Sequence, residues 1–208
     1  MSEVPFSNAD SATLKSEETR KQIVDAAAHL LSVQGMAATR LIDVVEYTQM
    51  QPAVTYYHFA SFGDLVEEVL YCGITEMRNH VEKRLDALPP DTPPVDRLMV
   101  AVETHLRREL ELSDYGSAWI RNAGHIPGGM TRRLKKEEAA YGRIWRNLFN
   151  DAIAGGAIAP GLNVWMARRL MLGAMNSATE WWDPRRGSVD TLVATTQLLI
   201  RSCLPSSA

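Results

Sequence analysis

The stretch from Thr39 to Leu65 constrains the fold of this chain more tightly than any other part of the sequence. Its first half carries an apolar face at the i, i+3 and i+4 spacing of a short helix: Leu41, Val44 and Val45. The polar residues 48–51 are too few for an element of their own, and Pro52 suits the first position of a second helix, where its missing N–H costs nothing. Phe59 closes that helix. Two short helices joined by a tight turn are the geometry that places a second helix in the major groove of DNA.

A further helix is predicted upstream of this stretch. Ser16 is expected to cap it, because Glu17 and Glu18 follow in the first turn, where the helix dipole favours anions. Its buried stripe is expected to be Ile23, Ala27, Leu30 and Leu31. Gly35 ends the helix in the position of a left-handed residue. Residues 1–13 are rich in Ser, Asn, Ala and Asp and are predicted to form a disordered arm.

Together these segments resemble the DNA-binding domain of the tetracycline-repressor (TetR) family of transcriptional regulators. The resemblance covers residues 19–65 without a gap. The residues that carry it are Thr39, Asp43, Tyr56, Tyr57, His58, Phe59, Ser61 and Leu65. It implies an all-α protein, with an N-terminal three-helix helix-turn-helix head over residues 14–61 and a C-terminal helical bundle for effector binding and dimerisation over residues 62–208. It also implies a ligand-responsive DNA-binding transcriptional regulator, expected to be a repressor.

Four positions depart from the pattern of that family. Gln49 stands where glycine is usual, which costs about 1 kcal/mol if the turn needs a left-handed backbone. Gln51 replaces the usual serine cap, Phe62 replaces a lysine, and Thr55 is expected on the core side, where its hydroxyl needs a partner. Residues 14–62 carry four cations and five anions, a poor charge balance for a nucleic-acid binder. These features keep open an alternative: a helical small-molecule-binding protein with a decayed DNA-binding head.

The second helix of the stretch carries most of the residues expected to contact DNA. Its tyrosines and histidine offer hydrogen-bond donors to phosphates, and the small apolar residues before them can touch thymine methyl groups. At the start of the preceding helix, Thr39 can cap the helix and, with Arg40, meet the DNA backbone. The predicted DNA-binding set is Thr39, Arg40, Gln51, Pro52, Ala53, Val54, Tyr56, Tyr57 and His58. The alternative for the aromatic residues is packing in a helical core.

The remaining chain is also predicted to be helical. No run alternates as a strand does, and two proline pairs end a long helix that Ser61 is expected to cap. Later helices are expected over residues 96–110, 130–154, 164–182 and 188–204, with a short segment at residues 115–122. Cys72 and Cys203 lie in apolar helical contexts and are expected to be buried thiols in a reducing cytoplasm. The N-terminus does not resemble a signal peptide, and no apolar run is long enough to span a membrane, so a cytoplasmic protein is expected.

The C-terminal bundle is expected to hold a small-molecule effector. Apolar walls with a few polar groups are typical of ligand sites, although core packing explains each residue as well. The predicted ligand-binding set is Trp119, His125, Tyr141, Trp145, Met171, Met175 and Asn176. Residues 173–184 are similar to a segment of TetR-type regulators that respond to fatty or sterol-derived acyl-CoA thioesters, which favours an apolar or acyl-CoA-like effector. The basic run at residues 132–136 can meet the phosphates of such a thioester, or form a solvated helix face.

The last two helices are predicted to join two copies of the chain into a homodimer, as the resemblance implies. Small residues that permit close helix approach and leucines that supply apolar area stand there: Gly173, Ala174, Ser177, Ala178, Leu192, Leu198 and Leu199. A dimer also suits DNA recognition, because one head reads only a half-site and a palindromic operator needs two. The alternative is packing within one chain.

Enzymatic readings find no support in the sequence. The five histidines show no H-E-x-x-H spacing, and neither a Gly-rich phosphate loop nor a nucleophile elbow is present. No cofactor and no metal are therefore expected. The expected partners are a double-stranded DNA operator, a small-molecule effector and a second copy of the chain, with no membrane.

Overall fold

The computed structural model describes residues 8–122, 124, 131–155 and 163–202, and these residues contain helices and no strand. The helices are α1 (Asn8–Val33), α2 (Leu41–Thr48), α3 (Pro52–His58), α4 (Phe62–Asp86), α5 (Pro94–Arg107), α6 (Asp114–Asn122), α7 (Arg132–Ala154), α8 (Val164–Asn176), α9 (Ala178–Trp181) and α10 (Val189–Ser202). A short 3₁₀ turn, η1 (Met36–Ala38), follows α1, and a π-helical turn, η2 (Arg108–Leu112), follows α5. The all-α prediction is confirmed.

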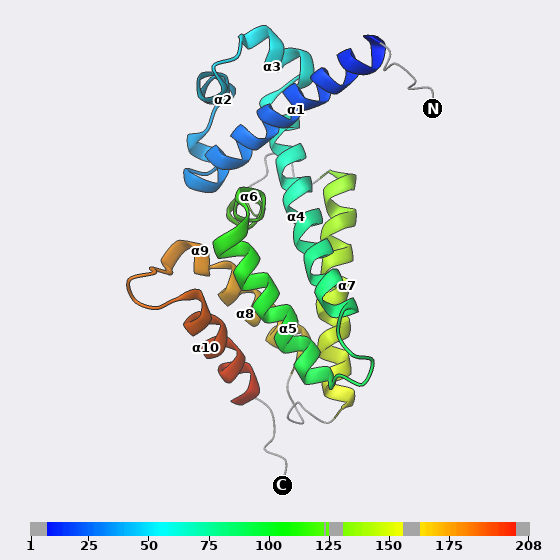
Figure 1. The fold of residues 1–208 in the computed structure, drawn as a ribbon. Coiled ribbons are helices and arrows are strands. Elements are labelled where there is room, and N and C mark those ends of the chain that lie inside the picture. Colours follow the sequence, from blue (N-terminus) through cyan, green and yellow to red (C-terminus); the bar gives the residue numbers. More distant parts are fainter. Residues whose placement is uncertain (1–7, 123, 125–130, 156–162, 203–208) are drawn as a thin grey trace, which may run out of the picture.

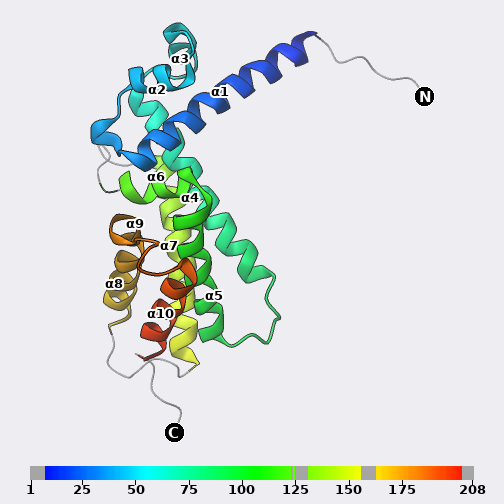
Figure 2. The ribbon, with the colours of Figure 1, turned by 60° about the vertical axis from the view of Figure 1, so that its left-hand side comes forward.

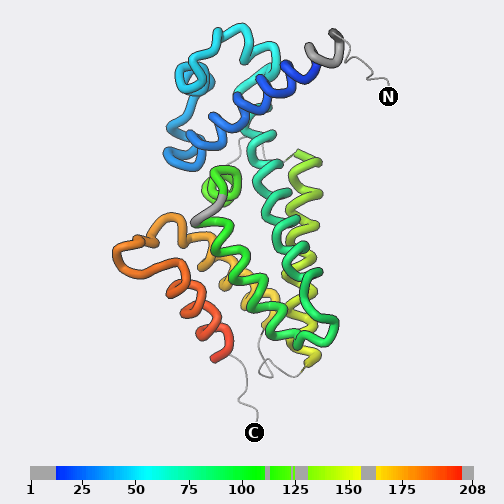
Figure 3. The backbone as a smooth tube through the Cα atoms, in the orientation of Figure 1, coloured from blue at the N-terminus to red at the C-terminus, as the bar shows by residue number. Residues whose placement is uncertain are grey.

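The helices form a small head and a larger body that α4 connects (Figure 1). α1, α2 and α3 gather at one end, and α4 leaves them to run along the body beside α5 and α7. α10 lies against α5 and α8 lies against α7, and Figure 2 shows α6 at the base of the head. The tube in Figure 3 follows the same path from α1 at the head to α10 at the far end of the body.

An apolar core holds the head together and continues into the start of α4. Its buried side chains include Ile23, Ala27, Leu31, Leu41, Val44, Val45, Phe59 and Leu65. Burial of a side chain of this size contributes about 1.5–3 kcal/mol each, so the predicted helix faces supply most of what holds these short helices in place. Leu30, which was expected in the stripe of α1, is only partly buried.

α4 begins and ends as its sequence predicts. The hydroxyl of Ser61 accepts a hydrogen bond from the backbone N–H of Asp64 at 3.1 Å, which caps the first turn. The helix stops at Asp86, before the proline pairs. Its buried stripe is Leu65, Val69, Ile74, Met77, Val81 and Leu85, with their neighbours Val66, Leu70 and Gly73.

α6 lies between the head and the body and contacts both. On the body side, a Cβ atom placed on Gly73 of α4 would stand only 2.2 Å from the carbonyl oxygen of Tyr115, so only glycine permits this approach. On the head side, the Tyr115 hydroxyl donates to Asp25 of α1 at 2.6 Å. The Asn122 side chain accepts from the N–H of Met36 at 2.7 Å and donates to the carbonyl of Leu31 at 3.1 Å.

Two helix boundaries differ from those expected. α1 starts at Asn8, so the predicted disordered arm is wrong for residues 8–13, and Ser16 lies inside the helix instead of capping it. No glycine or proline between Asn8 and Ser16 stops the helix earlier. The helix expected over residues 164–182 is broken at Ser177, whose hydroxyl donates to the carbonyl of Ala174 at 2.9 Å. Such side-chain bonds compete with the backbone ladder.

Candidate nucleic-acid interface and effector cavities

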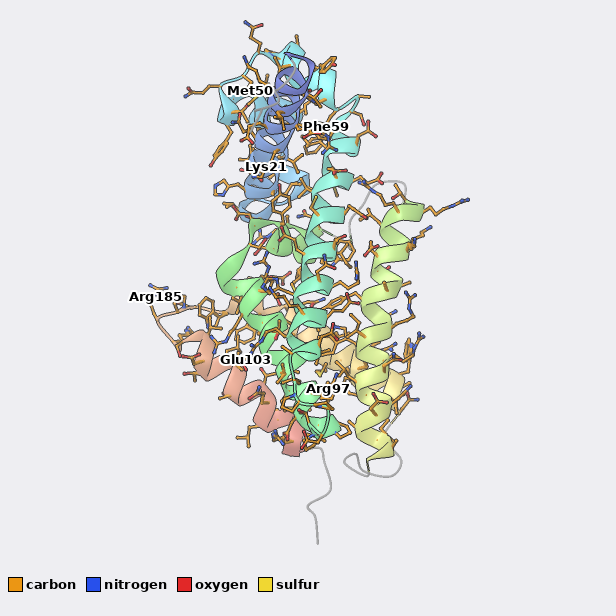
Figure 4. The ribbon with its side chains drawn as sticks, turned by 45° about the vertical axis from the view of Figure 1, so that its right-hand side comes forward. Lys21, Met50, Phe59, Arg97, Glu103 and Arg185 are labelled. Atoms are coloured by element: carbon orange, nitrogen blue, oxygen red, sulfur yellow. The ribbon has the colours of Figure 1, made fainter. Side chains whose placement is uncertain are left out.

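The turn between α2 and α3 has the geometry of a helix-turn-helix. Gln49 ends α2 in the left-handed region, with φ 56° and ψ 23°. Gln51 precedes α3 without a side-chain cap, and Pro52 occupies the first turn of the helix. Gln49 therefore adopts the backbone conformation for which the family uses glycine, and Gln51 does not replace the serine cap, as the sequence predicts. Figure 4 shows Met50 of this turn at the outer end of the head.

α3 buries one side and presents the other to solvent. Thr55 and Phe59 are buried, while Tyr56 is 59% exposed and Tyr57 81% exposed. Gln51, Pro52 and Ala53 are also exposed, and Val54 and His58 are intermediate. The alternative of core packing is therefore wrong for both tyrosines. The Thr55 hydroxyl is buried without a hydrogen-bond partner among the described residues, so the predicted need for a partner goes unmet.

Thr39 occupies a different position from the one expected. Its side chain is only 4% exposed, and its hydroxyl donates to the carbonyl of Gly35 at 2.7 Å. The α2 cap is instead formed by Asp43, whose carboxylate accepts from the N–H of Arg40 at 2.7 Å. The reason is that the η1 turn folds residue 39 back onto the end of α1. The predicted Thr39 cap is therefore wrong, and its hydroxyl is already used within the head.

Three cations of the head are paired with carboxylates of the same chain. Arg40 lies 2.9 Å from Asp43, and this hydrogen-bonded ion pair holds the pKa of the Asp43 carboxyl below its usual value. Lys21 pairs with Asp25 at 2.7 Å. Arg20 pairs with Glu68 of α4 at 3.1 Å and lies over the ring of Phe59. Figure 4 shows Lys21 and Phe59 in the head. A DNA phosphate must compete with these carboxylates for the same cations.

The predicted ligand-binding residues are divided between two cavities in the body. Met171 and Met175 line a cavity of about 460 Å³ together with side chains of α5, α7 and α10. We call it the apolar cavity, because no charged residue lines it. Trp119, Tyr141, Trp145 and Asn176 line a second cavity of about 380 Å³, which we call the His105 cavity. His125, the seventh predicted residue, lies outside the described residues.

A buried polar network gives the His105 cavity its character. Nδ1 of His105 lies 2.8 Å from the hydroxyl of Tyr141, and Nε2 lies 3.0 Å from Oδ1 of Asn176. Nε2 is also 3.3 Å from the carboxylate of Glu109 in η2. Trp145 meets the His105 ring edge-on, with 5.7 Å between the ring centroids. Burial raises the pKa of the Tyr141 phenol, which therefore stays protonated at neutral pH.

Several residues of this cavity were absent from the predicted set. His105 stands at its centre, Glu109 backs it, and Arg168 and Arg169 line it from α8. The i, i+4 spacing of His105 and Glu109 within an apolar helix face is a signal that sequence reasoning can use, because two ionisable groups there need each other as partners. The α8 arginines carry no such signal, since adjacent charges in a helix usually face solvent.

The basic run of α7 is partly used inside the structure. Arg133 pairs with Glu68 at 2.7 Å and with Glu67 at 3.5 Å, and its guanidinium lies 4.0 Å from the ring centre of Tyr71. All three partners belong to α4. Arg133 therefore links α7 to α4. Because its charge is already paired, binding of acyl-CoA phosphates by the basic residues 132–136 is disfavoured.

The outer faces of α8 and α10 are apolar and exposed. Leu170 is 74% exposed and Leu198 is 68% exposed. Trp165, Met166, Trp181 and Leu199 are also exposed. Exposed apolar areas of this kind mark sites of protein association. In the part of the chain that is described, no three His, Cys, Asp or Glu side chains are grouped to hold a metal ion, and no helix is long and apolar enough to cross a membrane.

Comparison with known proteins agrees with this geometry. A family model described as "Bacterial regulatory proteins, tetR family" matches residues 23–69. A second, "Tetracyclin repressor-like, C-terminal domain", matches residues 91–196. The HTH-type transcriptional repressor KstR2 of Mycolicibacterium smegmatis is 22% identical over 169 residues, 79% of this chain and 80% of that protein.

Solved structures share the fold. The ketosteroid transcriptional regulator KstR2 of Mycobacterium tuberculosis has a TM-score of 0.74 at 17% identity, covering 90% of this chain and 95% of that one. A regulatory protein of the tetR family from Rhodococcus RHA1 has a TM-score of 0.78 at 13% identity, covering 92% and 99%. Regulators of this family bind DNA operators and small-molecule effectors and form dimers. The chain therefore belongs to the TetR family and is a ligand-responsive DNA-binding transcriptional regulator, not an enzyme.

Proposed function

We propose that the protein is a homodimeric repressor that binds a palindromic operator through α3 and leaves it when an effector enters the body. The observation that carries this proposal is the exposed face of α3. Tyr56 and Tyr57 project from a short helix behind a tight turn, and no described part of the chain covers them. Two aromatic residues with hydroxyl groups on one exposed helix face form a contact surface, and the family supplies DNA as the partner of that face.

Each exposed side chain of the head has a proposed role on DNA. Tyr56, Tyr57 and His58 donate to phosphates, whereas Ala53 and Val54 contact thymine methyl groups. Gln51 and Pro52 stand at the start of α3 and complete the surface. Arg40 contacts the backbone once it exchanges Asp43 for a phosphate. We also propose a cytoplasmic location, since a bacterial regulator of this kind meets its operator there.

The homodimer is proposed to form through α8 and α10. Their exposed leucines and tryptophans would be covered in a four-helix contact, in which Gly173 and Ala174 let the helices approach closely. Two heads held at a fixed spacing would then read the two halves of a palindrome.

The effector is proposed to be a small apolar or acyl-CoA-like molecule. The His105 cavity supports this because it combines apolar walls with convergent polar groups. One protein of similar fold is a ketosteroid transcriptional regulator, and a ketosteroid is itself a largely apolar ring system with a few polar oxygens. Release requires that the effector bind the DNA-free conformation better than the DNA-bound one, since equal affinity shifts nothing.

A salt-titrated binding assay tests the operator proposal. The full chain is titrated onto its own upstream intergenic DNA and onto unrelated DNA of equal length. Specific binding with a measurable salt slope is expected, and the slope counts the phosphates contacted. Equal weak binding to both DNAs, with ligand binding retained, would instead favour the decayed head, an outcome to which the paired cations Arg20, Lys21 and Arg40 would contribute.

Substitution of Tyr56 by alanine tests the orientation of α3. Loss of a phosphate contact should weaken specific binding by about tenfold and leave the fold intact. Tyr47→Ala is the matched control, because Tyr47 is an exposed tyrosine of α2 that lies against His29 of α1. Equal affinity of the Tyr56 variant and the unmodified protein would show that this face of α3 does not meet DNA.

A further inference from the structure

The His105 cavity is lined by several hydrogen-bond donors and two arginines, with Glu138 as the acidic residue of its lining and the Glu109 carboxylate behind His105. We propose that it binds a ligand bearing a carboxylate or another anionic oxygen group, whose oxygens meet Trp145, Asn176 and the α8 arginines. This inference rests on the proposed effector function and specifies the chemistry of that effector. The apolar cavity has no charged lining and opens among residues of the proposed dimer face, Leu170, Trp181 and Leu199.

One donor is buried in the wall of the cavity. Trp145 is 0% exposed, and its indole Nε1 lies beside the Tyr141 hydroxyl but makes no well-aligned hydrogen bond with any described residue. A buried donor without a partner costs about 1–3 kcal/mol, a cost that a ligand oxygen would remove. Because an indole N–H can only donate, the group that satisfies it must be an acceptor.

The second donor follows from the proton positions of the polar network. Nε2 of His105 faces two acceptors, Oδ1 of Asn176 at 3.0 Å and the Glu109 carboxylate at 3.3 Å, so Nε2 must carry a proton. Nδ1 of the same ring lies 2.8 Å from the Tyr141 hydroxyl. The carbonyl end of Asn176 is thereby used, while its Nδ2 amide group donates to no described residue and remains for a ligand.

The charged residues that line the His105 cavity also favour an anionic ligand. Arg168 and Arg169 of α8 line the cavity, and neither forms an ion pair with a described residue. Arg169 lies over the ring of Trp165, 5.6 Å from its centre. Glu138 of α7 is the one acidic residue among those that line the cavity. The lining itself holds two cations and one anion, with the Glu109 carboxylate 3.3 Å behind His105, and guanidinium groups bind carboxylates in a bidentate manner.

The size of the cavity limits the anionic group to the end of a small apolar molecule. Its volume of about 380 Å³ and its apolar residues, among them Ile74, Met77 and Leu172, suit a short chain or one or two rings. An apolar body would lie along these walls, with its charged end against α8.

Octanoate and 1-octanol are the probes, because they share a chain and differ in charge. Binding of each to the full chain is measured by tryptophan fluorescence and by calorimetry. Octanoate is expected to bind at least about tenfold more tightly than octanol, the ratio typical of one charge-assisted hydrogen bond. Comparable affinity for the two, or no binding of octanoate up to its solubility limit, would overturn the proposal.

Two variants locate the carboxylate. Replacing Arg168 and Arg169 together by glutamine should weaken octanoate binding about tenfold without changing octanol binding. The control replaces Arg143 and Arg146 by glutamine, two exposed arginines of α7 that do not line the cavity. Asn176→Asp keeps the acceptor for His105 and repels an anion, so it should also weaken octanoate selectively. Unchanged octanoate affinity in both test variants would mean that it binds elsewhere.

The two proposals fail in different experiments. If the protein binds its operator and octanoate shows no arginine-dependent preference, the ligand inference is wrong and the repressor stands. If octanoate binds with the expected dependence but no DNA is bound specifically, the ligand inference holds and the operator proposal fails.

Discussion

At the scale of the residue, the turn of the head contains two side chains that lower its stability. Gln49 is the one non-glycine residue with positive φ in the described ranges, and such a conformation costs about 1–2 kcal/mol. Thr55, on the next helix, buries a hydroxyl without a partner among the described residues. The head therefore lacks stability that a glycine and an apolar residue would supply at these positions.

Gln49→Gly should stabilise the protein by about 1 kcal/mol, because glycine adopts this backbone conformation without strain. Urea unfolding should show a higher midpoint with the same slope. The control is Gln22→Gly on the exposed side of α1, which should lose about 1 kcal/mol, since glycine inside a helix is unfavourable. A lower free energy of unfolding for both glycine variants would contradict the backbone strain at Gln49.

Cys72 should react slowly with thiol reagents at neutral pH. Burial, with help from Glu68 and Glu76, raises its pKa from 9.0 to about 11. At pH 8 its thiolate fraction is therefore lower by about 100-fold, and the rate should keep rising with pH up to about 11.

The measurement on Cys72 uses a Cys203→Ser variant, so that one thiol remains, and compares folded with urea-unfolded protein. The folded state favours the neutral thiol, so this group's contribution to stability is complete below pH 9.0 and is lost as the pH rises through about 11. Equal rates in folded and unfolded protein would contradict its burial.

At the scale of the element, α6 depends on the absence of one side chain in α4. Gly73 lets the backbone of α6 lie directly against α4, and Arg108 of η2 pairs with Glu76 one turn further along. The same helix also supports α1. A small change at this contact therefore affects both ends of the molecule.

Gly73→Ala should destabilise the protein by about 3 kcal/mol or more, because its Cβ would stand 2.2 Å from a backbone oxygen that cannot easily move. Gly142→Ala in α7 is the control: nothing lies within 4 Å of its added Cβ, and alanine should gain about 1 kcal/mol there. Thermal unfolding of both variants measures the difference. A higher unfolding temperature for both the Gly73 and the Gly142 variant would show that α6 lies further from α4.

The elements that sequence reasoning identified are those with strong local signals. Pro52 and Ser61 mark helix starts, and Gln49 occupies a position that the turn itself defines. The position of Thr39 was missed because it depends on how η1 folds back on α1. The His105 cavity was recovered only in part, because its lining comes from five helices whose packing no single segment encodes.

At the scale of the whole molecule, the apolar outer faces of α8 and α10 require a partner. Leu170 of α8 is 74% exposed and Leu198 of α10 is 68% exposed. The Arg185 turn that joins α9 to α10 projects from the body in Figure 4, away from Glu103 and Arg97 of α5.

Leu198→Glu should convert the dimer to a monomer at micromolar concentration. A charge buried in an apolar contact costs several kcal/mol, which is about 100-fold or more in the dimer dissociation constant. Sedimentation equilibrium measures it, and affinity for a palindromic operator should fall in parallel. Val33→Glu, at an exposed apolar residue of α1, is the control and should leave a dimer. A dimer of unchanged affinity in the Leu198 variant would place the interface on another face.

The attachment of α6 to the head sets where this protein can be divided. Asn122 bonds the backbone of α1 and η1, and Ser32 of α1 donates to Asp114 at 2.8 Å. A fragment cut at residue 61 would leave these groups, and the apolar side of α1, without their natural cover. Swapping heads between related regulators at that point would therefore join mismatched surfaces. A chimera that exchanges α6 together with the head keeps the two contacting surfaces from the same protein. In relatives, the residues of α6 and those of α1 and η1 that contact each other are expected to change together.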